Sequence, residues 1–156
     1  MTAEYTLKNS FLNVYTKFKL QFYRKIFGRF ETREASLSAV ETFSVEVINA
    51  LNNPTISDFA RFVNISQANA AYKVQSLIKK GYVRKVRDEK DRREYRLLLT
   101  ERFDEYNRLN TDYVGEVVSR MEKRFSCEEL RILQHILDVI NAELMPEIPN
   151  DPLRST

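Results

Sequence analysis

Residues 54–100 read PTISDFARFVNISQANAAYKVQSLIKKGYVRKVRDEKDRREYRLLLT, and this stretch decides the fold. Its pattern predicts two short helices separated by a tight turn, followed by two strands, at about 82–87 and 94–99, joined by a charged tip. Thr55 can cap the first helix and Ser66 the second, because a hydroxyl accepts a hydrogen bond from a free N–H group of the first turn. Gly81 ends the second helix, since the left-handed conformation that follows a helix is least costly for glycine. The stretch therefore predicts a helix-turn-helix followed by a hairpin.

The second of these helices has one apolar face and one polar face. The apolar stripe consists of Ala70, Val74, Leu77 and Ile78. The opposite face carries Gln67, Ala68, Asn69, Tyr72, Lys73 and Ser76. Amides pair with adenine, a small alanine admits a thymine methyl group, and a lysine reaches guanine or phosphate. The polar face is thus suited to reading DNA, although an ordinary solvated face would have a similar composition.

Positive charge is concentrated in the same stretch. Residues 55–100 hold 11 Lys and Arg against 5 Asp and Glu, whereas the whole chain holds 25 against 22. The rest of the chain therefore carries 14 basic and 17 acidic residues, a net negative balance. A local basic excess is what binding by phosphate neutralisation requires. We interpret the stretch as a candidate DNA-binding region, the alternative being charges that only keep an exposed hairpin soluble.

The tip sequence Asp91-Arg92-Arg93, with Leu97, Leu99 and Thr100 after it, resembles the wing signature of MarR-type winged helix-turn-helix regulators. Residues 55–60, 65–67 and 77–83 resemble the DNA-reading helices of that family in order and spacing. The resemblance implies that Arg93 enters the minor groove, that Asp91 pairs with a nearby cation, and that Arg92 or Lys90 touches phosphate. It also implies a homodimer on a pseudo-palindromic operator in double-stranded DNA. The candidate DNA-binding residues are Ser66, Gln67, Ala68, Asn69, Tyr72, Lys73, Lys90, Asp91, Arg92 and Arg93.

Two amphipathic helices are predicted before this stretch. The first covers about residues 4–27, with an apolar stripe of Phe11, Tyr15, Phe18, Phe22 and Ile26. Gly28 is expected to terminate it, and residues 28–35 form a polar connection. The second covers about residues 38–51, where Ser38 and Glu41 form a capping-box pattern. The residues of this helix that we expect to face inward are Val40, Phe43, Val47, Ile48 and Leu51.

Two further helices are predicted after it. Thr100 can cap a long helix to about Phe125, and Ser126 with Glu129 forms another capping box. The last helix repeats Leu130, Leu133, Leu137, Ile140 and Leu144 at heptad-like spacing, with Ile132, Ile136 and Val139 on an adjoining face. The first and last helices carry more apolar surface than one winged domain can cover, so we expect them to form a dimer interface. Burial within one subunit is the alternative.

The predicted fold class is mainly α with a small β-hairpin wing, a winged helix-turn-helix reader plus a helical dimerisation region. Residues 1–35 are assigned to an N-terminal dimerisation helix and connection, 36–100 to the DNA-binding domain, 101–145 to C-terminal dimerisation helices and 146–156 to a flexible tail. No apolar run approaches membrane-spanning length and no signal-peptide pattern opens the chain. We therefore expect a cytoplasmic protein without a membrane partner.

Other chemistry has few candidate residues. Cys127 is the only cysteine, which excludes an intramolecular disulfide; its place in the first turn of a helix leaves a redox role as a minor alternative. His135 is the only histidine, so a histidine-rich zinc site cannot be assembled. No nucleophile with a base, phosphate-binding glycine loop or clustered carboxylate pair is present. We predict no catalytic residues, no metal and no cofactor.

The resemblance also bears on regulation, because MarR relatives often bind small aromatic or lipophilic acids between the reader and the dimerisation helices. Tyr15, Phe18, Phe22 and Phe43 could line such an effector pocket, with Arg24 or Lys25 nearby for an anion, or they could simply form core. The predicted function is DNA-binding transcriptional regulation, with repression as the expected mode and a ligand shifting the population of DNA-competent dimers. The alternative is a winged-helix protein-interaction module without specific DNA binding.

Overall fold

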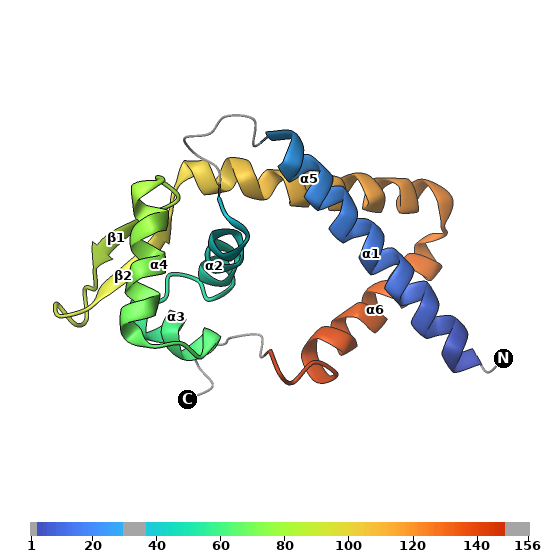
Figure 1. The fold of residues 1–156 in the computed structure, drawn as a ribbon. Helices are drawn as coiled ribbons and strands as arrows, with labels where there is room; N and C mark the ends of the chain where they lie inside the picture. Colours follow the sequence, from blue (N-terminus) through green and yellow to red (C-terminus); the bar gives the residue numbers. More distant parts are fainter. Residues whose placement is uncertain (1–2, 30–36, 149–156) are drawn as a thin grey trace.

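The computed structural model describes residues 3–29 and 37–148, and within these ranges it contains six helices and one two-stranded antiparallel hairpin. The elements are α1 (Ala3–Arg29), α2 (Ala39–Ala50), α3 (Ile56–Val63), α4 (Gln67–Lys79), β1 (Val83–Arg87), β2 (Tyr95–Leu99), α5 (Glu101–Arg124) and α6 (Cys127–Glu143). The predicted fold class, mainly α with a hairpin wing, is confirmed. Figure 1 shows α2, α3, α4 and the hairpin gathered at one end of the molecule, while the long α5 leads away from them.

The hydrophobic core lies in the winged-helix end. Val45 and Ile48 of α2, Val74 and Leu77 of α4, and Leu97 of β2 have no exposed surface. Two aromatic residues, one from α3 and one from α5, complete the centre: Phe59 and Phe103. Burying apolar side chains of this size is the main favourable term in folding, so this core fixes α4 and the hairpin in one arrangement.

The local signals that divide these elements act as the sequence predicts. Ser38 with Glu41 and Ser126 with Glu129 form reciprocal capping boxes, and Thr55 forms a third with Asp58. Asn64, at φ 54°, ends α3 in the left-handed conformation that asparagine tolerates, which makes the turn before α4 tight. Gly81 ends α4 at φ 81°, as expected from its position. The chain then enters the hairpin, in which Val83 pairs with Leu99 and Arg87 with Tyr95.

Three expectations about local structure are wrong. Gly28 lies inside α1, which continues to Arg29; one glycine costs a helix about 1 kcal/mol but does not by itself stop it. In α2, Val40 and Phe43 are 50% and 61% exposed, because the buried face is centred on Val45 and Ile48 instead. Thr100 stands at the N-cap position of α5, but its hydroxyl donates to the Gly81 carbonyl oxygen at 2.5 Å rather than capping the helix.

The outer helices leave apolar surface uncovered. On α5, Phe103 and Tyr106 are buried, and the side chains that follow on the same side are half-buried: Asn110, Tyr113, Val117 and Met121. In α6, by contrast, no residue is buried. Its exposed apolar side chains include Ile132, Ile136 and Leu137. Those of α1 include Leu7, Phe11, Leu12 and Val14.

None of the described helices combines the length and the apolar character needed to cross a membrane. Most of the polar connection expected at 28–35 and the end of the expected tail fall on residues 30–36 and 149–156, which lie outside the described residues.

Candidate nucleic-acid interface

The N-terminal half of α4 presents the predicted recognition face. Gln67, Ala68 and Asn69 are exposed, and Tyr72 is 78% exposed. Ser66 caps the helix, since its Oγ accepts a hydrogen bond from the Asn69 amide at 3.2 Å. The Gln67 Nε2 donates to the Ser57 hydroxyl of α3 at 2.9 Å, which orients its amide. This end of α4 therefore offers amide, hydroxyl and aromatic groups to a ligand, next to the positive end of a helix dipole.

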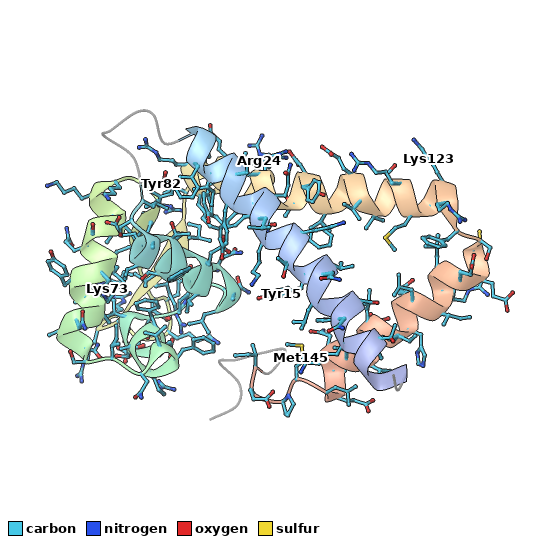
Figure 2. The ribbon with its side chains drawn as sticks, turned by 45° about the vertical axis from the view of Figure 1, so that its right-hand side comes forward. Tyr15, Arg24, Lys73, Tyr82, Lys123 and Met145 are labelled. Carbon is cyan, nitrogen blue, oxygen red and sulfur yellow. The ribbon has the colours of Figure 1, made fainter. Side chains whose placement is uncertain are left out.

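The remaining predicted residues of α4 are placed differently from one another. Lys73 is half-buried and lines an apolar hollow of about 160 Å³ between α2, α3 and α4; Figure 2 labels it on α4. Ser76 does not face outward, because its hydroxyl donates to the Glu41 carboxylate of α2. Lys73 thus lies partly against apolar side chains, and Ser76 leaves the recognition face.

The tip of the wing is held by a buried carboxylate. Asp88, 8% exposed, accepts hydrogen bonds from the backbone amides of Lys90 and Asp91 at 2.6 and 3.1 Å. The Arg96 guanidinium donates to the same carboxylate, and these donors together lower the pKa of Asp88 to about 2. Asp88 therefore remains charged at neutral pH, and its hydrogen bonds to the backbone hold the turn at the tip.

The basic side chains of the tip point into solvent. Lys90, Arg92 and Arg93 are exposed, and in the part of the chain that the structure describes they form no ion pair. Their backbone is ordered by the neighbouring aspartates, including an Arg93 amide that donates to Asp91 at 2.9 Å. The wing thus presents three exposed cations without ion pairs on a backbone fixed by hydrogen bonds. Contacts to phosphate or in the minor groove need this arrangement.

The expected role of Asp91 needs correction. Instead of pairing with a cation, Asp91 accepts the backbone amide of Arg93, and the ion pair at the base of the wing joins Asp88 to Arg96. The Arg96 guanidinium also lies 3.8 Å from the carboxylate of Asp58, which caps α3. Asp88 is closer to the strands than Asp91 and faces β2, so it is the carboxylate that Arg96 can reach. Arg96 thereby ties the wing to the helix-turn-helix, a role that the sequence analysis missed.

Glu41 is a second positioning residue that the sequence analysis read only as a cap. Its carboxylate accepts hydrogen bonds from the Ser38 amide at 2.7 Å, from the Lys80 ammonium at 2.6 Å and from the Ser76 hydroxyl. Burial raises the pKa of Glu41, but these donors outweigh burial and lower it to about 2. Since Ser76 and Lys80 belong to the C-terminal end of α4, Glu41 fixes the recognition helix against α2.

Replacing Glu41 with glutamine should lower the free energy of unfolding by about 1–2 kcal/mol at about pH 7, because a charge-assisted hydrogen bond to Lys80 is lost. A carboxyl whose pKa falls on folding stabilises the native state above its unfolded value, 4.5, and this stabilisation disappears as the pH falls toward about 2. Unfolding curves of the wild type and Glu41→Gln should therefore converge on acidification. The exposed Glu122→Gln on α5 serves as the control. Curves for Glu41→Gln and wild type that stay parallel down to acid pH would contradict the role given to Glu41.

The recognition helix and the wing share one groove. A hollow of about 240 Å³ is lined by residues of the first turn of α3, by Gln67 of α4, and by Lys85 and Arg93 of the hairpin. Two predicted DNA-binding residues, Gln67 and Arg93, are thus brought to the same concave surface from different elements. Glu94 and Tyr95 of the hairpin complete the lining, so one carboxylate lies there beside the amide, the ammonium and the guanidinium. The lining side chains keep a net positive charge, which suits a polyanionic ligand.

Three of the four residues predicted for an effector pocket line one hollow. Tyr15, Phe22 and Phe43 border a cavity of about 590 Å³ between α1 and α2. Phe18 instead packs edge-on against Tyr113 of α5, with ring centroids 5.6 Å apart. Neither Arg24 nor Lys25 lines this cavity, and the Lys25 ammonium lies 5.8 Å from the Tyr113 ring. Among the described residues, the cationic side chain that lines this cavity is that of Lys19.

Other candidate chemistry is limited. Cys127 is a free, exposed cysteine at the start of α6. Within residues 3–29 and 37–148, no three His, Cys, Asp or Glu side chains cluster closely enough to hold a metal ion.

Comparison with known proteins agrees with this geometry. Residues 37–102 match the family model of the winged helix DNA-binding domain. The helix-turn-helix and hairpin therefore define the class: this is a winged-helix protein. A comparison with curated protein sequences found no match.

Solved structures extend the likeness to most of the chain. FabT of Streptococcus pneumoniae, solved in complex with DNA, is 23% identical, with 87% of this chain and 94% of that one covered and a TM-score of 0.57. The transcriptional regulator Tm0710 of Thermotoga maritima is 16% identical, covering 86% and 94%, with a TM-score of 0.64. A MarR family protein of Bacillus stearothermophilus is 16% identical, covering 93% and 99%, with a TM-score of 0.63. The chain thus has the fold of MarR-family regulators, as the sequence resemblance implied.

Proposed function

We propose that this protein is a sequence-specific DNA-binding transcriptional regulator that occupies a pseudo-palindromic operator as a homodimer, with repression as its mode of action. One observation carries the proposal: the polar end of α4 and two cations of the wing that are unpaired within the described residues, Lys85 and Arg93, border one groove, and the carboxylates of Glu41 and Asp88 hold α4 and the wing in place. FabT, which has a similar fold, was solved bound to DNA. Such a regulator works where the DNA is, in the cytoplasm of its cell.

The recognition residues divide by the part of DNA that each can contact. The amides of Gln67 and Asn69 suit adenine in the major groove, and Ala68 leaves room for a thymine methyl group. Tyr72 and Lys73 lie further along α4, where hydroxyl and ammonium groups reach the backbone. Lys90, Asp91 and Arg92 shape and charge the wing, from which Arg93 enters the minor groove. Ser66 acts through the cap that fixes the first turn of the helix.

The homodimer is supported by the uncovered apolar faces at the two ends of the chain. No residue of α6 is buried, and α1 leaves Leu7 and Phe11 72% and 57% exposed. Contiguous apolar surface of this kind is typical of subunit interfaces. A two-fold axis through these helices would place two α4 helices in successive major grooves, about one helical turn apart.

Regulation by a small molecule is the third part of the proposal. The cavity between α1 and α2 joins a helix of the dimerisation region to a helix of the winged domain. A ligand there would change the distance between the two recognition helices, and so favour dimers that fit the operator less well.

Selection of bound duplexes from a random pool, at two salt concentrations, tests the DNA-binding part. We expect enrichment of an inverted repeat with half-sites about one helical turn apart, and affinity that falls steeply with salt. Binding without an enriched sequence would leave a non-specific, charge-driven binder. Absence of binding at both salt concentrations would favour a winged-helix protein-interaction module instead.

A further inference from the structure

A carboxylate lies in the wall of the aromatic cavity between α1 and α2. Glu46 of α2 borders this cavity of about 590 Å³ together with the aromatic side chains Tyr15, Phe22, Tyr23, Phe27 and Phe43. Figure 2 shows Tyr15 near the middle of α1. The rest of the wall consists of Lys19, Ile26, Leu37, Ala39 and Thr42. A carboxylate among aromatic rings loses hydration, which costs free energy unless a hydrogen-bond donor or a cation stabilises the charge.

Glu46 lacks the partners that its neighbour on the same helix has. Glu41 is satisfied by three donors, whereas no cationic side chain in the described ranges lies within ion-pair distance of Glu46. Burial raises the pKa of Glu46, and the nearby Tyr106 offsets only part of that effect. The carboxylates of Glu41 and Glu46 therefore differ in their partners and in the direction of their pKa shifts. A cation beside Glu46 would stabilise its charged form.

A second unsatisfied group lies behind Glu46. Tyr106 of α5 is 5% exposed, and its hydroxyl has no hydrogen-bond partner among the described residues. Its own burial and then the charge of the nearby Glu46 carboxylate raise the pKa of this phenol. The two groups influence each other, but the phenol brings no positive charge to Glu46. A carboxylate whose neighbour is a neutral phenol can still gain from a cation.

The cavity also has aromatic faces that accept positive charge. The Lys19 ammonium lies 4.5 Å from the centre of the Tyr15 ring, so a cation already uses one of these faces. Tyr15 is 53% exposed, which places this contact at the rim, in contact with water. Lys19 borders the cavity, as Glu46 does, and both residues are only partly exposed. No ion pair joins the Lys19 ammonium to the Glu46 carboxylate within the described residues, so Lys19 does not neutralise Glu46.

We propose that this cavity binds a lipophilic organic cation, an ammonium or phosphonium centre carrying aromatic or aliphatic groups, with Glu46 as its counter-ion. Aromatic rings attract a cation through their negative faces, and the attraction is strongest where water is excluded. An organic acid would instead bring its charge close to Glu46. The inference names the effector class of the proposed regulator, so its regulatory meaning rests on the proposed function; binding itself does not require DNA.

Two probes of the same shape and opposite charge test the proposal. Tetraphenylphosphonium and tetraphenylborate each carry four phenyl groups around one charged atom, and both can be titrated calorimetrically into the DNA-free full chain. We expect the phosphonium to bind the wild type about tenfold more tightly than the borate. Glu46→Gln, which keeps the side-chain shape, should weaken phosphonium binding about tenfold and leave the melting temperature nearly unchanged. Glu122→Gln, exposed on α5, should bind both ions as the wild type does.

Equal or stronger binding of the borate would overturn the proposal, as would Glu46→Gln binding the phosphonium within about twofold of the wild type. A wild type that binds neither ion would overturn it too. These titrations contain no DNA, so failure of the proposed operator binding leaves their outcome intact. Conversely, phosphonium binding that leaves an established operator complex unchanged would uphold the ligand site and remove it from regulation.

Discussion

Replacing Arg93 with alanine should weaken operator binding by about 1–3 kcal/mol, the usual cost of losing one arginine contact in a groove. The guanidinium is exposed at the wing and forms no ion pair within the described residues, so its loss removes no contact that holds the fold. The turn itself is retained, because the Arg93 backbone amide still donates to Asp91. Equilibrium titration of a fluorescent duplex carrying the selected operator measures the change in affinity.

Two further variants separate a minor-groove contact from general attraction. Arg93→Lys keeps the charge but loses the planar guanidinium, which is more easily desolvated in a narrow groove, so it should recover only part of the lost affinity. Lys123→Ala, at the end of α5 far from the wing, should change affinity little (Figure 2). If Arg93→Ala binds as tightly as the wild type, the wing has no part in recognition. If Arg93→Lys restores binding fully, Arg93 contributes only its charge.

Those parts of the fold that depend on neighbouring residues could be predicted from the sequence. Thr55 and Ser66 cap the helices that they precede, and Gly81 takes the left-handed conformation that its position requires. Each signal acts within one helical turn, so no knowledge of the distant chain is needed. The same holds for the basic side chains of the charged tip, whose exposure follows from the absence of apolar residues there.

Contacts between distant residues could not be predicted in this way. Arg96 meets Asp88 across the hairpin and Asp58 across the domain, and Glu41 meets Ser76 and Lys80 across two helices. Periodicity identifies the face of a helix but not the residue that will lie opposite it. For that reason the sequence pattern predicted a cation beside Asp91, whereas the structure places the cation, Arg96, beside Asp88.

The inner face of α2 shows the limit of periodicity itself. Apolar residues lie on two adjoining edges of this helix, and the pattern does not say which edge meets the core. Packing against α4 selects Val45 and Ile48, which leaves Val40 and Phe43 outside. Phe43 then becomes part of the wall of the cavity between α1 and α2, where the prediction of an effector pocket had also placed it. The carboxylate of that cavity was missed, because Glu46 looks like any solvated residue of an amphipathic helix.

A chain that ends at Phe125 should sediment as a monomer at micromolar concentrations at which the full chain is a dimer. Removing α6 takes away no buried residue of the single subunit, so the winged-helix core should remain folded. What is lost is an apolar face that has no cover in one chain, and burial of such a face is the main source of stability in a homodimer interface. Sedimentation velocity measures the change, and circular dichroism confirms that the remaining helices persist.

A point variant makes the same test without deletion. Ile136→Glu places a charge on the exposed apolar face of α6, where the side chain is 48% exposed in one subunit, and should shift the full chain toward monomer. The matched control Gln134→Glu adds the same charge to the same helix at a position that is already polar and exposed, and should remain a dimer. A monomer can place only one α4 on an inverted repeat, so operator affinity should fall together with dimerisation. A truncated chain that still sediments as a dimer would show that the subunits associate through another surface, and the apolar face of α6 would then need a different partner.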